Sequence, residues 1–173
     1  MAGEIEVRPV RPDEYEEAGR VTARAYEEFV PPEEPGWRAY VDRIADVAGR
    51  AQRTTVLVAL LDGAIAGTAT VELDQHIEDD WRQPIAADET HLRMLGVDPA
   101  YRNRGVGRAL MDATIALATE RSRSRVTLET TAQMQAAQRM YLSMGFVPQG
   151  DHELEPGLTL LSYELRLPSG VEH

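Results

Sequence analysis

The order of strand-like and helix-like segments in the second half of the chain is the feature that most restricts its fold. A β-rich run, "THLRMLGV" at 90–97, precedes a helical pattern over 105–121 and a second β-rich run, "RVTLET" at 125–130. Strands joined by a helical crossover of this length pair in parallel, because a tight turn cannot join them. Ligands bind such sheets at the carboxyl ends of the parallel strands. The segment that follows residue 97 is therefore the first candidate for a site.

The remaining segments complete a predicted α/β fold. Asp62–Gly63 joins two β-rich runs, which favours a tight antiparallel hairpin. Apolar periodicity predicts further helices at 13–29, 37–48 and 133–144, and β-rich composition predicts further strands at 5–10 and 158–167. The sheet is therefore expected to be mixed, with an antiparallel first half.

Composition narrows the class of protein. The 173 residues and the 43% hydrophobic content predict one domain over 1–173. There is no cysteine, no signal-peptide pattern and no apolar run of roughly 18 residues, so a cytoplasmic protein without a membrane partner is expected. The net charge of −11 argues against a nucleic-acid-binding surface and favours a cationic small-molecule partner.

A positively charged, glycine-rich turn follows the strand at 90–97. The stretch "VDPAYRNRGVGRALM" at 97–111 places arginines around two glycines at the start of a predicted helix. Exposed backbone N–H groups and the helix dipole suit an anion such as a pyrophosphate. A solvated helix start is the alternative. The dinucleotide fingerprint GxGxxG fits poorly, because Leu110 stands at its third glycine position and "DPAYRNR" separates Gly105 from the strand.

Two motifs in this order resemble those of the GNAT family of N-acetyltransferases. The first, "RNRGVG" at 102–107, is similar to the family's pyrophosphate motif of Gln or Arg, two residues, Gly, one residue, and Gly or Ala. The second, "AAQRMYLSMGF" at 136–146, carries Ala137, Tyr141 and a Gly–Phe pair. Met134 stands where the family often has an asparagine that contacts CoA, so that contact is not carried over.

The resemblance implies a fold and a cosubstrate. It implies a single-domain α/β fold with a mixed central sheet of about six to seven strands and about four flanking helices. Acetyl-CoA is expected in the cleft between two splayed parallel strands, with its pantetheine arm along the first of them. The residues implied in acetyl-CoA binding are Leu95, Gly96, Val97, Arg102, Asn103, Arg104, Gly105, Val106, Gly107 and Arg108. No metal is expected, since the four histidines show no ligand spacing.

The implied reaction is direct acetyl transfer from acetyl-CoA to a primary amine in a ternary complex. Tyr141 matches the tyrosine that, in many members, donates a proton or a hydrogen bond to the departing sulfur, and core packing is its alternative role. Some members use a glutamate base on the strand before the phosphate motif, and His91 stands there in this chain. A histidine accepts a proton at neutral pH. Glu89 on the same strand face, Glu72, and a chain of water molecules remain alternatives.

The acceptor is expected to be a small-molecule or protein amine. In the family, the connection between the first two helices often lines the acceptor pocket, which here points to Phe29, Glu33, Glu34 and Trp37. The acidic residues favour a cationic acceptor. A non-catalytic acyl-CoA-binding sensor is the alternative function, and the sequence is compatible with a monomer or a homodimer.

Overall fold

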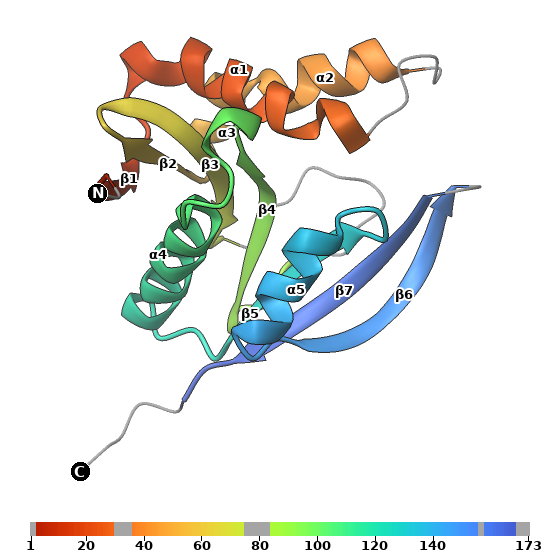
Figure 1. The fold of residues 1–173 in the computed structure, drawn as a ribbon. Helices are drawn as coiled ribbons and strands as arrows, with labels where there is room; N and C mark the ends of the chain where they lie inside the picture. The colour runs from red at the N-terminus through yellow and green to blue at the C-terminus, as the bar shows by residue number, and fades with distance from the viewer. Residues whose placement is uncertain (1–2, 30–35, 75–83, 156–157, 169–173) are drawn as a thin grey trace. The chain divides into compact units, whose positions relative to one another are not determined.

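The computed structural model describes residues 3–29, 36–74, 84–155 and 158–168. Its seven strands form one mixed sheet in the order β1-β2-β3-β4-β5-β7-β6 (Figure 1). The strands are β1 (Ile5–Pro9), β2 (Thr55–Leu61), β3 (Ala64–Glu72), β4 (Glu89–Val97), β5 (Arg125–Thr131), β6 (Val147–Glu155) and β7 (Leu158–Arg166). The α-helices are α1 (Tyr15–Tyr26), α2 (Trp37–Ala45), α3 (Val47–Ala51), α4 (Val106–Glu120) and α5 (Gln135–Ser143). Short 3₁₀ helices are η1 (Pro12–Glu14), η2 (Glu27–Phe29) and η3 (Pro99–Tyr101).

The chain divides into two compact units. The first unit holds residues 1–71 and 94–114, and the second holds residues 72–93 and 115–173. The boundary cuts β3 at its last residue, and it also cuts β4 and α4. The phosphate loop, defined as residues 98–108, therefore lies wholly in the first unit, whereas α5 lies wholly in the second.

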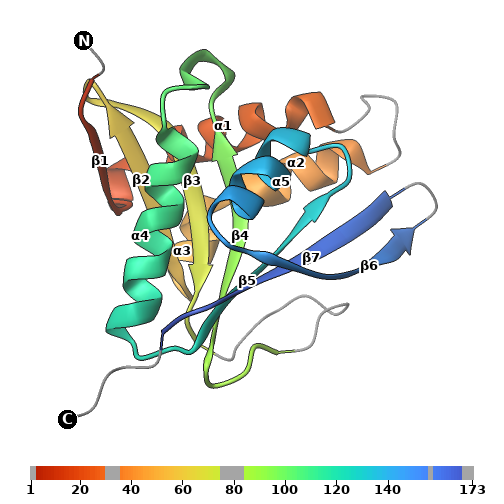
Figure 2. The same cartoon turned by 60° about the horizontal axis from the view of Figure 1, so that its bottom comes forward.

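Alternation along β2 builds the core of the first unit. Val56 and Val58 are buried and pack with Ala18 of α1 and Val47 of α3. Figures 1 and 2 show α1 to α3 on one face of β1, β2 and β3, and α4 on the other face. Leu57 is buried as well. Helices cover both faces of β2, which explains its almost continuous apolar sequence.

The turns of the first unit lie where the sequence predicts them, except at Asp46. Asp62 and Gly63 have positive φ values of 54° and 82°, as the predicted tight hairpin requires. The single helix predicted at 37–48 is wrong, because the structure has two helices there. Asp46 has φ −80° and ψ 71°, and its side chain accepts a hydrogen bond from the Gly49 N–H at 2.9 Å. Asp46 thereby ends α2 and caps α3.

The second unit is built on the antiparallel strands β5, β7 and β6, with the start of β4 parallel to β5. This parallel pairing confirms the crossover prediction. Helix α5 lies over β5 and β7 (Figure 1), where the Tyr141 ring contacts the rings of Phe146 and Tyr163 at 5.8 Å between centroids in each pair. The sequence pattern does not predict β6, because Pro148 and Gly150 interrupt any alternation and shift the register with β7.

Strand β4 changes its backbone conformation near its middle. Its described pairing with β5 covers Glu89–Leu92. Met94, two residues farther along, has a backbone φ of 52°, in the left-handed region that residues other than glycine rarely adopt. Strand β4 nevertheless continues to Val97 and β5 to Thr131. The described pairing thus ends at Leu92 of β4 and Leu128 of β5.

Candidate functional site

The phosphate loop leaves β4 through a turn that its own residues fix. Asp98 caps η3 by accepting the Ala100 N–H at 3.0 Å. Asn103 and Gly105 have positive φ values of 63° and 85°. Glycine is favoured at 105 by this backbone angle rather than by crowding, since the nearest atom to an added Cβ would be 3.9 Å away. The chain then enters α4 at Val106.

Asp98 anchors this turn to the rest of the first unit. Its Oδ2 accepts from Arg24 Nη2 at 2.8 Å and from Nε at 3.1 Å, and its backbone N–H donates to the Ala66 carbonyl at 2.8 Å. Burial alone would raise the pKa of Asp98, but the Ala100 N–H and the Arg24 guanidinium together bring the pKa below its ordinary value. Asp98 is therefore ionised at neutral pH.

The start of α4 presents backbone N–H groups to a ligand. The Ala109 N–H donates to the Gly105 carbonyl at 3.0 Å. The N–H groups of Val106, Gly107 and Arg108 precede this bond and have no partner within the helix. The first turn of this 15-residue helix carries no acidic residue. These groups and the helix dipole have the electrostatics of an anion site.

The arginines of the phosphate loop differ in their surroundings. Arg102 forms an ion pair with Glu28 of η2, and its Nη2 donates to the Ala25 carbonyl at 3.4 Å. Arg104 is exposed, with its guanidinium carbon 5.9 Å from the centroid of the Tyr101 ring. Arg108 is also exposed. An anion at the helix start would therefore have to compete with Glu28 for Arg102.

The last residues of β4 lie close to α1. A Cβ at Gly96 would come within 2.7 Å of the Ala25 Cβ, so the close approach requires glycine. The Tyr26 hydroxyl donates to the Leu95 carbonyl at 3.1 Å. Leu95 and Gly96, two of the three residues predicted to pair with pantetheine, are thus positioned by contacts from α1.

Tyr141 lies on α5 in the core of the second unit and is 4% exposed. Burial, and to a smaller extent Tyr163, raises the pKa of Tyr141 far above its ordinary value. The phenol therefore stays protonated at any physiological pH. In this state it is able to donate a proton but not to accept one.

Glu89 and His91 are linked through Thr127 of β5. Both are almost fully buried and, as their spacing predicts, they lie on the same face of β4. The Thr127 hydroxyl donates to Glu89 Oε2, and Thr127 Oγ1 lies 2.9 Å from His91 Nδ1. Glu89 Oε1 accepts the Ala86 N–H at 3.0 Å and lies 3.7 Å from Arg125 Nη2. Two of the candidate bases thus belong to one hydrogen-bonded group.

Glu72, the third candidate base, is buried at the end of β3, although a lone polar residue on a strand usually faces solvent. Its Oε1 accepts from Arg93 Nη1 at 3.0 Å. Its Oε2 is buried without a hydrogen-bond partner among the described residues. Glu72 therefore lies in an ion pair, a structural role that competes with a catalytic one.

A cavity of about 380 Å³ lies on the polar sheet face, defined as the side of β4 to β7 that carries Glu89, His91, Thr127, Glu129 and Glu164. Its lining comes from four strands and comprises Glu89, Arg125, Thr127, Leu128, Glu129, Gln149, His152, Ser162, Tyr163 and Glu164.

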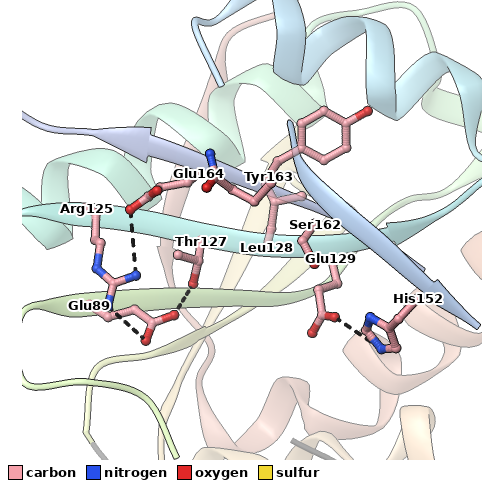
Figure 3. Close-up of a pocket in the computed structure, with 10 residues that line it drawn as sticks. Glu89, Arg125, Thr127, Leu128, Glu129, His152, Ser162, Tyr163 and Glu164 are labelled. Carbon is pink, nitrogen blue, oxygen red and sulfur yellow. Dashed lines mark hydrogen bonds and ion pairs between the residues drawn. The ribbon is translucent and has the colours of Figure 1, made fainter. Parts of the chain in front are cut away.

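Figure 3 shows how the charged groups of this lining are arranged. Arg125 lies between Glu89 and Glu164, with Nη1 3.6 Å from Glu164 Oε1. His152 Nε2 faces Glu129 Oε2 at 3.9 Å. Three carboxylates and one guanidinium make the described lining negative while His152 is neutral.

The residues predicted to line the acceptor pocket are described only in part. Phe29 ends η2, and the Arg102 guanidinium carbon lies 6.0 Å from its ring centroid. Glu33 and Glu34 lie outside the described residues, as does the side chain of Trp37, whose backbone begins α2. The placement of these four residues around an acceptor stays a prediction.

The described ranges contain no group of three histidine, cysteine or acidic side chains that could hold a metal ion. No helix within them has the length and hydropathy needed to cross a bilayer.

Sequence reasoning did not assign Arg125, Thr127, His152 or Glu164 to a site. Arg125 closes the basic run at 121–125, a pattern typical of a solvated loop, and His152 lies on the unpredicted β6. The available signal was the period-two spacing from Arg125 through Thr127, which places polar side chains on one face of β5. Only the register between strands shows which other side chains they meet.

Comparison with known proteins gives matches in one family. The model of the acetyltransferase (GNAT) family matches residues 21–146. A human protein named N-acetylaspartate synthetase is 34% identical over 105 residues, which are 60% of this chain and 32% of the human protein. A mouse protein named N-acetyltransferase 8F1 is 35% identical over 69 residues, which are 40% of this chain and 31% of that protein. The chain spans about a third of the length of these curated relatives.

Solved structures agree with the fold over nearly the whole chain. An acetyltransferase from Salmonella typhimurium with its cofactor acetyl-CoA superposes with a TM-score of 0.70 at 18% identity, covering 98% of both chains. Ard1 from Thermoplasma volcanium superposes with a TM-score of 0.72 at 19% identity, covering 98% of this chain and 100% of the other. At identities of 18% and 19%, the similarity to these structures establishes a shared fold and no more.

Proposed function

Because the chain belongs to the acetyltransferase (GNAT) family, we propose that it is an acyltransferase that moves the acetyl group of acetyl-CoA directly to a primary amine. Residues 1–173 act as one N-acetyltransferase domain in this proposal. The reaction takes place in the cytoplasm, which the absence of cysteine fits, and the protein works as a monomer or a homodimer.

One observation carries the proposal. The matched region, 21–146, includes both the phosphate loop and Tyr141, and both have the properties that the reaction needs. The loop offers N–H groups to an anion, and Tyr141 keeps its proton. A sensor that only bound acyl-CoA would need the loop but not the phenol.

Acetyl-CoA is bound by the phosphate loop and the end of β4. The N–H groups at the start of α4, with Gly105 and Gly107 leaving room, hold the pyrophosphate, and Arg102, Arg104 and Arg108 supply positive charge around it. Asn103 and Val106 shape the loop between them. The pantetheine arm lies along Leu95, Gly96 and Val97, as in the pattern that the sequence resembles.

The chemistry requires one base and one acid. The acceptor nitrogen must lose a proton before it attacks the thioester carbon; a C–N bond then forms and the C–S bond breaks. His91 takes the proton of the acceptor, with Glu89 as its partner through Thr127. Tyr141, whose burial disfavours the phenolate, keeps its proton and donates a hydrogen bond to the departing sulfur, and the thiolate takes its proton from solvent. Glu72 is the second candidate for the base, but its ion pair with Arg93 makes it less suitable.

The acceptor is a cationic amine in this proposal. Among the described residues that line the cavity on the polar sheet face, the three carboxylates of Glu89, Glu129 and Glu164 outnumber the guanidinium of Arg125, which supports binding of positive charge. Its volume of about 380 Å³ is within the range of small-molecule sites. The name of the human relative instead points to aspartate as an acceptor for that protein, and the same carboxylates would repel aspartate.

Release of CoA in the presence of an amine panel tests the function. The panel contains propane-1,3-diamine, lysine amide, a neutral amine and aspartate, and free thiol is measured while mass spectrometry identifies the acetylated product. Release with the diamine or lysine amide is the expected result. Acetylation of aspartate alone would contradict the cationic acceptor, and acetyl-CoA binding without release with any amine would favour the sensor.

The identity of the base is tested by the pH dependence of kcat/KM. A base works only when deprotonated, so activity rises with pH through its titration. That acidic limb should vanish in His91→Ala and persist in Glu72→Gln. A limb that persists in His91→Ala and vanishes in Glu72→Gln would move the role to Glu72.

A further inference from the structure

Thr127 occupies the point at which β4 and β5 bring Glu89 and His91 together. His91 and Thr127 are direct partners in the parallel register, and Glu89 lies two residues before His91 on the same strand face. One hydroxyl group therefore serves both neighbours: it donates to Glu89 Oε2 and lies 2.9 Å from His91 Nδ1. Glu89 and His91 are buried and Thr127 is half-buried, so both bonds are partly shielded from water.

The number of protons available to Thr127 and Glu89 fixes which atom donates in each of the two bonds of Thr127 Oγ1. An ionised carboxylate accepts hydrogen bonds but donates none, and a threonine hydroxyl has a single proton. The Ala86 N–H at 3.0 Å and the Arg125 guanidinium at 3.7 Å both stabilise the negative charge of Glu89. The Thr127 proton is therefore used on Glu89, and Thr127 Oγ1 is left to accept from His91. His91 must then carry its proton on Nδ1.

We propose that Thr127 is a positioning residue that fixes neutral His91 as the Nδ1–H tautomer, so that Nε2 carries the lone pair. In a neutral histidine, the hydrogen bond made by one ring nitrogen decides whether the other nitrogen carries a proton or a lone pair. This inference rests on the proposed function for its catalytic meaning, since it makes Nε2 the atom that takes the proton of the acceptor amine.

The same bonds stabilise His91 after proton transfer. When Nε2 gains a proton, the ring becomes positively charged and its Nδ1–H still donates to Thr127, whose hydroxyl still donates to Glu89. The carboxylate thus acts on the imidazolium through one hydroxyl. This corresponds to the role of the aspartate in a serine-protease triad, where an acid orients the histidine without being protonated itself.

Nitrogen NMR of the imidazole tests the tautomer without any turnover. The ¹⁵N shifts of His91, assigned by comparison with His91→Ala, distinguish a protonated ring nitrogen from one with a lone pair. Wild-type protein and Thr127→Ser are expected to show Nδ1–H, because both keep the hydroxyl. Thr127→Val should lose this preference. Glu89→Ala should reverse it, since the hydroxyl proton then becomes available to Nδ1.

Kinetics with the same variants test the positioning role. Thr127→Val should lower kcat about 10- to 100-fold, less than the 10² to 10⁴ expected for loss of a base itself, at unchanged acetyl-CoA affinity. Thr127→Ser should restore most of the rate. If Thr127→Val does not fold, Thr127→Ala removes the hydroxyl with a smaller side chain.

The outcomes separate this inference from the proposed function. An Nε2–H tautomer in the wild-type protein, the same tautomer in Thr127→Val and wild type, or a changed tautomer with unchanged kcat would each overturn it. If no amine releases CoA from the wild-type protein, the proposed function fails. The NMR comparison would then still decide whether Thr127 sets the tautomer.

Discussion

The phosphate loop and the polar sheet face present their functional groups in two different ways. The loop is a contiguous segment, and the groups that it offers are backbone N–H groups at the start of α4, flanked by arginine side chains. The cavity on the polar sheet face takes its lining from each of β4, β5, β6 and β7, and residues of this face are connected by hydrogen bonds and ion pairs between strands.

This difference predicts how each region responds to substitution. A backbone donor survives most changes of its own side chain and is lost when a Cβ obstructs the ligand. A side chain that holds or transfers a proton is lost with its functional group. Substitutions in the loop should therefore change acetyl-CoA affinity, whereas substitutions in the second unit should change turnover or acceptor binding.

The largest effect is expected for Tyr141→Phe. The change removes the phenolic proton but keeps the ring between Phe146 and Tyr163, so kcat should fall by roughly 10² to 10⁴ while acetyl-CoA affinity stays nearly constant. Because burial raises the pKa of Tyr141, the wild-type enzyme should not lose activity at alkaline pH through this phenol. Steady-state kinetics over the pH range in which the enzyme is stable give kcat of the variant and the alkaline activity of the wild type, and titration calorimetry gives the acetyl-CoA affinity.

Tyr163→Phe is the matched control for this variant. Tyr163 is buried in contact with Tyr141, and its substitution also removes one hydroxyl from the same core. Tyr163 belongs to the cavity lining, but its ring points away from the carboxylates of the polar sheet face and toward Tyr141 (Figure 3), so the variant should leave kcat close to that of the wild type. Equal losses in the two variants, or none in Tyr141→Phe, would return Tyr141 to a packing role.

The second effect is expected in the loop. Gly107→Val places a branched side chain next to the N–H groups of α4 and should weaken acetyl-CoA binding about 10- to 100-fold, as each lost hydrogen bond to a charged group contributes about 1.5 to 3 kcal/mol. Arg102→Ala should weaken binding less, and its effect should shrink as salt increases. Titration calorimetry provides both affinities. Unchanged binding by the valine variant, with the fold retained, would show that the pyrophosphate lies elsewhere.

A smaller effect is expected at Glu129. Glu129→Gln removes one negative charge from the cavity and should raise KM for a cationic amine about five- to tenfold, equivalent to about 1 to 1.4 kcal/mol and in the range of one ordinary hydrogen bond, with acetyl-CoA affinity unchanged. Glu153→Gln is the control, since Glu153 is an exposed residue of the neighbouring part of the sheet, on β6, outside the described lining. A lower KM in Glu129→Gln would contradict a cationic acceptor at this site.

The smallest effect is expected at Glu28, and it tests whether the ion pair with Glu28 keeps Arg102 from the pyrophosphate. Glu28→Gln removes the ion pair with Arg102 and leaves that guanidinium available for the pyrophosphate. The pair is about half exposed, so a two- to fivefold gain in acetyl-CoA affinity is expected, equivalent to about 0.4 to 1 kcal/mol. Glu27→Gln, on the same 3₁₀ helix, should bind like the wild type. Weaker binding by Glu28→Gln would mean that Glu28 holds Arg102 in its binding position.

Local sequence determined much of the fold and the place of the phosphate loop between β4 and α4, whereas the contacts of Asp98 and Arg102 come from distant residues. The crossover from 97 to 125 predicted the parallel pair, and Asp62–Gly63 predicted the hairpin, because loop length and turn residues act over a few neighbours in the chain. The same holds for Gly105, whose positive φ is a property of one residue. Local patterns failed at Asp46, where a side-chain cap splits a helix, and at β6, where Pro148 and Gly150 hide a strand.

Tertiary structure decided which side chains meet. The sequence by itself placed Glu89 and His91 on one face of a strand and proposed Tyr141 as an acid, since those statements need only strand periodicity and a motif. It could not connect Glu89 to His91 through Thr127, 36 residues after His91, because that contact depends on the register between β4 and β5. Register is fixed by the packing of whole sheet faces, not by any short segment of the chain.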